Sequence, residues 1–121
     1  SILGGVKRYH RVGVGALHRH VSELVDSPNP DSVFLTCADS RILPDTITAS
    51  RPGDLYIVRN VGNLVPTDPA ERSVDAALDF AVNRLGVSSV VVCGHSSCRA
   101  MQVVLDDDAA VADHPIGQWL G

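Results

Sequence analysis

Hydrophobic residues follow two kinds of pattern along the chain, short continuous runs and longer stretches with helical spacing. The continuous runs occupy residues 33–37, 55–58 and 88–93 and are rich in Val, Leu and Ile. Runs of this length with little alternation are typical of strands buried in a parallel sheet. We therefore predict three strands in these segments.

Helical spacing is found in residues 14–25, in residues 69–85 and in a short segment after Cys98. The second of these has Asp68 at the position of an N-cap and Pro at the first helical position, with Glu71 three residues after the cap. Gly86 follows as a natural terminator. We predict helices in all three segments.

The order of these elements indicates the fold class. A strand, a helix and a strand in succession pair in parallel through a right-handed crossover, which gives an α/β fold with helices flanking a parallel sheet. A shorter helical turn is predicted at residues 44–47. Residues 1–13 show no clear period and contain Gly4-Gly5, so we predict an irregular arm there. We predict one domain over residues 1–121.

Composition narrows the possible functions. The formal net charge of −4 disfavours nucleic acid as a partner, because phosphate binding needs a basic patch. The longest apolar run is far shorter than the ~20 residues of a membrane helix. The N-terminus also lacks an apolar run followed by a small-residue cleavage site. We expect no membrane span in this chain and a cytoplasmic location.

Two stretches carry the candidate chemistry, residues 37–41 (Cys-Ala-Asp-Ser-Arg) and residues 93–98 (Cys-Gly-His-Ser-Ser-Cys). Both follow predicted strands, and ligands of open α/β sheets bind at the carboxyl ends of strands. Cys37, His95 and Cys98 form a tetrahedral zinc ligand set with the fourth position open. Cys93 lies inside an apolar run and is interpreted as a core residue.

Asp39 has two possible roles at such a site. In an extended segment, residues 37, 39 and 41 point to the same side. The Asp39 carboxylate could then bind zinc itself and close the site. Alternatively, Arg41 could hold Asp39 in a bidentate pair, so that water binds zinc and Asp39 orients the resulting hydroxide. Asp39 and Arg41 taken alone would be a structural ion pair.

These two stretches resemble the zinc signature of β-class carbonic anhydrases. Residues 52–55 (Pro-Gly-Asp-Leu), 59–63 (Arg-Asn-Val-Gly-Asn) and 73–86 are similar to segments of the same family. The resemblance covers roughly residues 14–105. It implies that Zn²⁺ is bound by Cys37, His95 and Cys98, with Asp39 as an exchangeable fourth ligand and Arg41 as its partner.

The resemblance also implies a homodimer or a larger assembly with the active site near the subunit interface. The start of the chain and residues 65–72 are similar, in addition, to bacterial members that are soluble domains of sulfate-permease-type transporters, which implies attachment to a membrane transporter. Two features depart from the family. Arg99 follows the second zinc-binding cysteine, where the family usually has Gly, and members continue with a further strand and C-terminal helices. We therefore expect that the C-terminal part of the domain is missing.

The resemblance implies zinc-dependent reversible hydration of CO2 to bicarbonate and a proton, by zinc-bound hydroxide. One alternative is a catalytically silent zinc domain that acts as a bicarbonate sensor or assembly module, which Arg99 and the short C-terminus favour. Another is a COS or CS2 hydrolase with the same ligands. A redox role for Cys93 and Cys98 is disfavoured, because a dithiol motif would normally be Cys-x-x-Cys.

Overall fold

Three parallel strands form the sheet at the centre of the structure, a computed structural model that describes residues 1–121 apart from the side chain of Ala16. They are β1 (Ser32–Cys37), β2 (Leu55–Asn60) and β3 (Ser89–Cys93), in the order β2-β1-β3. Phe34 lies opposite Ile57 on one side and Val91 on the other. The three predicted strands and the α/β class are confirmed.

The core is built around β1, the central strand. Val33, Leu35 and Thr36 have no exposed surface, and the Thr36 hydroxyl donates to the Cys93 carbonyl at 2.9 Å. A strand that is covered on both faces needs apolar residues throughout, which explains the continuous run in the sequence. The β3 strand lies at the edge of the sheet, and Val91 is 41% exposed.

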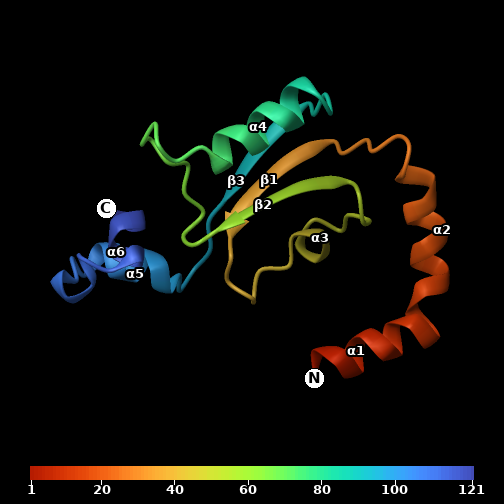
Figure 1. Cartoon of the computed structure of the whole chain (residues 1–121), viewed down its shortest axis with the longest axis horizontal. Helices are drawn as coiled ribbons and strands as arrows, with labels where there is room; N and C mark the ends of the chain where they lie inside the picture. The colour runs from red at the N-terminus through yellow and green to blue at the C-terminus, as the bar shows by residue number, and fades with distance from the viewer.

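Helix α4 (Ser73–Asn83) lies along the sheet (Figure 1) and buries Val74 and Ala81. The predicted start at residue 69 is wrong, because the preceding residues form a turn. There the Asp68 carboxylate accepts from the amide of Ala70 at 2.9 Å. The Glu71 carboxylate accepts from the amide of Ser73, at 2.8 Å. Asp68 therefore stabilises the turn before the helix, and Glu71 accepts from the first residue of the helix itself.

The N-terminal segment is helical, so the predicted irregular arm is wrong. Helix α1 (Ile2–Arg8), the π-helical segment η1 (Tyr9–Gly13) and helix α2 (Val14–Leu24) follow one another. The Ser1 hydroxyl caps α1 by accepting from the amide of Gly4 at 3.2 Å. Figure 1 shows that α2 lies to one side of the sheet and that α1 turns back below it in this view.

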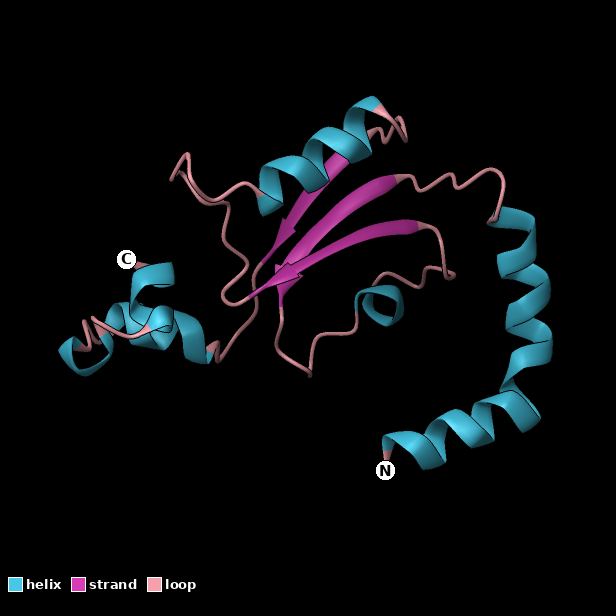
Figure 2. Ribbon diagram, viewed as in Figure 1, coloured by secondary structure: helices cyan, strands magenta, loops and turns pink.

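Helix α3 (Pro44–Ile47) follows β1, and the remaining helices come after β3. These are α5 (Arg99–Leu105), the 3₁₀ segment η2 (Ala109–Val111) and α6 (Pro115–Leu120). Figure 2 shows α5 and α6 beyond the carboxyl ends of the strands, where the site was predicted. Across the described residues, no helix has both the length and the apolar character to cross a membrane.

Candidate metal centre

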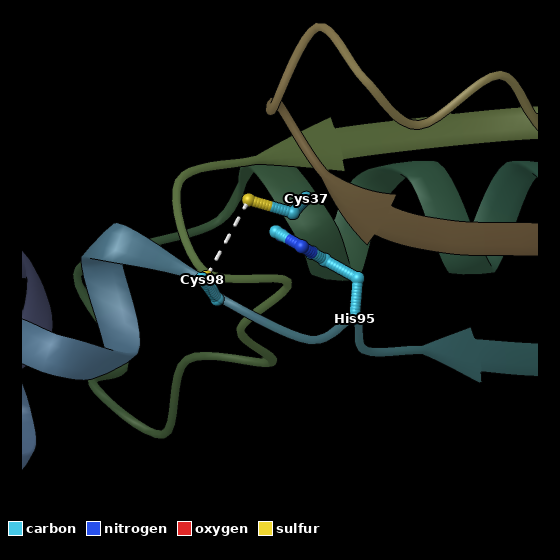
Figure 3. Close-up of side chains that lie close together, drawn as sticks. All are labelled: Cys37, His95 and Cys98. Atoms are coloured by element: carbon cyan, nitrogen blue, oxygen red, sulfur yellow. Dashed lines mark hydrogen bonds between the residues drawn. The ribbon is translucent and has the colours of Figure 1, made fainter.

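Three predicted ligands meet at the carboxyl ends of β1 and β3. Cys37 is the last residue of β1, His95 lies in the loop after β3, and Cys98 is the N-cap of α5. Their ligand atoms all lie within 4.8 Å of one another, and the two cysteine Sγ atoms are 4.0 Å apart. Figure 3 shows the three side chains pointing toward a common point.

The separation of the two thiols suits a single metal ion. Two thiolates at ~2.3 Å from a tetrahedral zinc are separated by roughly 3.8 Å. The observed Sγ–Sγ distance of 4.0 Å is close to that value. Both cysteines are buried, and neither forms a disulfide. The thiol pair therefore fits zinc with little rearrangement.

His95 supports the same conclusion. Its side chain is only 8% exposed, and its Nε2 atom is buried without a hydrogen-bond partner. Its Nδ1 atom lies 2.9 Å from the Ser96 carbonyl, which can only accept, so Nδ1 carries the hydrogen and Nε2 has a free lone pair. Metal-binding histidines are commonly oriented in this way. A zinc ion bound by the two cysteines would give this buried lone pair the partner that it lacks.

The surroundings of Cys37 favour its thiolate form. Burial acts to raise the pKa of this thiol, but interactions with His95 and with the Gly62 backbone amide outweigh it and lower the pKa to about 7, from an ordinary 9.0. The amide of Gly62 donates to the sulfur at 3.4 Å. The interaction with Cys37 also raises the pKa of His95. Zinc binds the thiolate, so an environment that lowers the thiol pKa favours metal binding by Cys37.

Asp39 and Arg41 form a close ion pair beside these ligands. Arg41 Nη2 lies 2.8 Å from Asp39 Oδ2, and its Nε lies 3.0 Å from Oδ1. The backbone amide of Arg41 also donates to Oδ1, at 2.8 Å. The predicted extended segment is wrong, because the chain turns after Cys37. Asp39 and Arg41 meet through that turn rather than through alternation along a strand.

A further hydrogen bond fixes the Asp39–Arg41 pair next to the three ligands. Arg41 Nη2 also donates to the carbonyl of Ser97 at 3.0 Å, which links the loop after β1 to the loop after β3. Asp39 Oδ2 lies 4.0 Å from His95 Nε2, close to the cluster. Hydrogen bonds from Arg41 hold the pKa of the Asp39 carboxyl well below its usual range, so it stays ionised. In this arrangement the carboxylate is held by Arg41.

The end of β2 and the loop after it support the site, a role that the sequence did not predict. Arg59 donates to the carbonyl of Cys37 at 3.0 Å and to the carbonyl of Asp39 at 2.7 Å. The Trp119 indole donates to the carbonyl of Val61 at 2.7 Å. The one feature of the sequence that could have indicated this role is the position of Arg59 near the end of a predicted strand. Nothing in the sequence indicated the contact from Trp119, because the two residues are 58 positions apart.

Cys93 stays apart from the site. The structure places it at the end of β3, half-buried, with its thiol directed to the neighbouring Gly94 carbonyl at 3.4 Å. It is absent from the group of ligand atoms formed by Cys37, His95 and Cys98. The prediction that Cys93 is a core residue is therefore only partly right, since the edge position of β3 leaves this residue partly exposed.

Comparison with known proteins agrees with this geometry. The carbonic anhydrase family profile matches residues 32–121. The chain is 38% identical to beta carbonic anhydrase 1 of Caenorhabditis briggsae, over 98% of the chain and 48% of that protein. It is also 38% identical to a carbonic anhydrase of Pseudomonas aeruginosa, over 93% of the chain and 54% of that protein.

The chain belongs to the β-class carbonic anhydrase family. Its structure superposes on the β-carbonic anhydrase CcaA with a TM-score of 0.88 and 30% identity, covering 98% of this chain and 59% of that one. The chain thus spans about half the length of the curated relatives that it matches. β-Carbonic anhydrases use zinc, and the group formed by Cys37, His95 and Cys98 fits a zinc site.

Replacing Gly62 with alanine is expected to weaken zinc binding roughly tenfold, in the range seen when groups that orient metal ligands are lost. Gly62 has φ +83°, and a Cβ there would lie 2.7 Å from the Met101 methyl. The Met101 methyl can move aside, but alanine is strained at this φ, and relief of that strain shifts the amide that donates to Cys37. Competition with a chromogenic chelator measures the zinc affinity.

Gly86 provides a matched control for this substitution. It has φ +67°, but a Cβ added there would meet no other atom within 4 Å, so alanine at this position has the backbone strain alone. Gly86→Ala should lose some stability and keep its zinc affinity. Equal zinc affinities in the two variants would show that the Gly62 hydrogen bond does not matter for the metal.

Proposed function

We propose that this chain catalyses the reversible hydration of CO2 to bicarbonate and a proton. The observation that carries the proposal is the buried group formed by Cys37, His95 and Cys98, with the Asp39–Arg41 pair directly beside it. Membership of the carbonic anhydrase family supports it further. We assign Cys37, His95 and Cys98 as the metal ligands.

When bound, zinc lowers the pKa of a coordinated water so that hydroxide is available near neutral pH. The chain's own residues then determine the orientation of the reactants. Asp39 is ionised and can only accept hydrogen bonds, so it would accept the hydrogen of the hydroxide that zinc supplies and would orient that group for attack on CO2. Arg41 holds this carboxylate in position and would keep it from binding the metal itself.

We also propose that the chain acts in a homodimer or larger assembly. The helical arm exposes Ile2, Leu3 and Val12, of which Ile2 is 86% exposed, and apolar surface of this kind is commonly covered by a partner. Crystal structures of two β-carbonic anhydrases from Sordaria macrospora, which this chain matches with a TM-score of 0.79, are described as tetrameric. A cytoplasmic location and attachment to a membrane transporter stay predictions from the sequence.

Stopped-flow measurement of CO2 hydration tests the proposed activity. The chain is loaded with one zinc per molecule, assayed from neutral to alkaline pH, and compared with the same protein after chelation. We expect activity only with zinc, and more of it as the pH rises. A zinc-loaded chain that is inactive at every pH would contradict the proposal and favour the catalytically silent zinc domain.

A further inference from the structure

A polar hollow opens beside the metal centre on the side of the ion pair. Its volume is about 580 Å³, and it is lined by Asp39, Ser40, Arg41, Ser97 and Arg99. Two arginines and one aspartate therefore line the same space. The lining comes from both loops that carry the ligands, since Asp39 follows Cys37 and Arg99 follows Cys98.

The two arginines differ in the number of hydrogen bonds and ion pairs that their side chains already make. Arg41 donates to both oxygens of Asp39 and to the carbonyl of Ser97. Arg99 is exposed and, among the side chains that the structure describes, makes no ion pair. Because the charges of Asp39 and Arg41 cancel, the net positive charge of the hollow comes from Arg99.

This charge is local, since the chain as a whole carries a net charge of −4. A guanidinium presents its N–H groups as a planar fork that matches the oxygens of a carboxylate-like anion. Bicarbonate is a small planar anion of this type. Ser40 and Ser97 line the same space, and a serine hydroxyl can act as a further donor.

We infer that Arg99 makes this hollow an anion subsite that holds bicarbonate beside the metal centre. The inference rests on the proposed function, because bicarbonate is the product of the hydration reaction and the substrate of its reverse. Arg99 increases the local concentration of bicarbonate and thereby lowers the bicarbonate concentration at which dehydration reaches half its maximal rate. The family usually has Gly at this position, so the subsite distinguishes this chain from members that follow the usual signature.

The test compares bicarbonate binding by the zinc-loaded full chain and its variants. Sodium bicarbonate is titrated at constant ionic strength, and the dissociation constant is read from the amide chemical shifts of Ser97 and residue 99. We expect Arg99→Gln to weaken binding about three- to tenfold, the size expected for one charge-assisted contact at a partly exposed site. Arg99→Lys should recover part of the affinity, and the difference should shrink in ~1 M salt.

Arg84→Gln is the matched control. It removes the same charge from an exposed arginine at the end of α4, before β3 begins and therefore at the opposite end of the sheet. It should bind bicarbonate like the unmodified chain. Equal affinities of Arg99→Gln and Arg84→Gln would overturn the inference.

Zinc content and CO2 hydration are measured on the same samples, which separates this inference from the proposed function. If the chain is inactive but binds bicarbonate through Arg99, the subsite stands and the proposed reaction fails. If the chain is active and Arg99→Gln binds bicarbonate as tightly as before, the reaction stands and the subsite fails. In the dehydration direction, Arg99→Gln should raise KM for bicarbonate by the same factor, with a smaller change in kcat.

Discussion

Replacing Cys37 with alanine is expected to leave the chain without bound zinc and to lower CO2 hydration by at least about a thousandfold. Cys37, His95 and Cys98 are the only group of ligand atoms with metal-binding geometry among the described residues. With one thiolate removed, two ligands remain, too few to hold the ion in a tetrahedral site. Since metal-assisted chemistry supplies much of the rate enhancement in hydration reactions, activity should fall with the metal.

The measurements are zinc per chain after dialysis and the stopped-flow rate. Cys93→Ala is the control, because Cys93 is also a cysteine at the end of a strand but its sulfur lies outside the ligand group. It should keep both zinc and activity. Circular dichroism of both variants checks the fold, since Cys37 is buried and its truncation leaves a small cavity. Retention of one zinc per chain by Cys37→Ala would refute the ligand assignment.

The metal centre was predictable because its parts lie where general rules of α/β folds place them. The apolar run of β1 identified a buried strand, and Cys37 ends it. Parallel strands share an edge at their carboxyl ends, which brought His95 and Cys98 to the same place. Spacing and chemistry then led to zinc without knowledge of the loops between the strands.

Other features depend on contacts that have no local pattern. The N-terminal helix forms although Gly4 and Gly5 each cost about 1 kcal/mol in helix propensity, so the sequence argued against it. Arg59 supports the site only because the loop after β1 folds back over the end of β2 and brings the carbonyl of Asp39 within 2.7 Å. The pair of Asp39 and Arg41 was among the predicted alternatives, but the turn that brings the two side chains together was not, because the segment was considered as extended.

Replacing Arg41 with glutamine is expected to lower CO2 hydration by about a hundredfold at neutral pH while the chain keeps its zinc. Arg41 makes three side-chain hydrogen bonds to Asp39. Without them the Asp39 carboxylate keeps only the hydrogen bond from the backbone amide of residue 41. Its other oxygen, already 4.0 Å from His95 Nε2, can turn toward the ligands and occupy the open position. A displacement of about 1 Å at a reacting group can cost ~10²-fold in rate, so either loss of orientation or closure of the site explains the size of this effect.

Two further variants show how the loss arises. Arg41→Gln combined with Asp39→Asn removes a carboxylate that could close the site, so zinc should be held less tightly than in Arg41→Gln alone, where Asp39 adds a fourth ligand. Arg51→Gln removes an exposed arginine from the turn before β2, at the other end of the sheet, and should leave the rate unchanged. If Arg41→Gln hydrates CO2 at the rate of Arg51→Gln, the Asp39–Arg41 pair is a structural ion pair and has no part in the reaction.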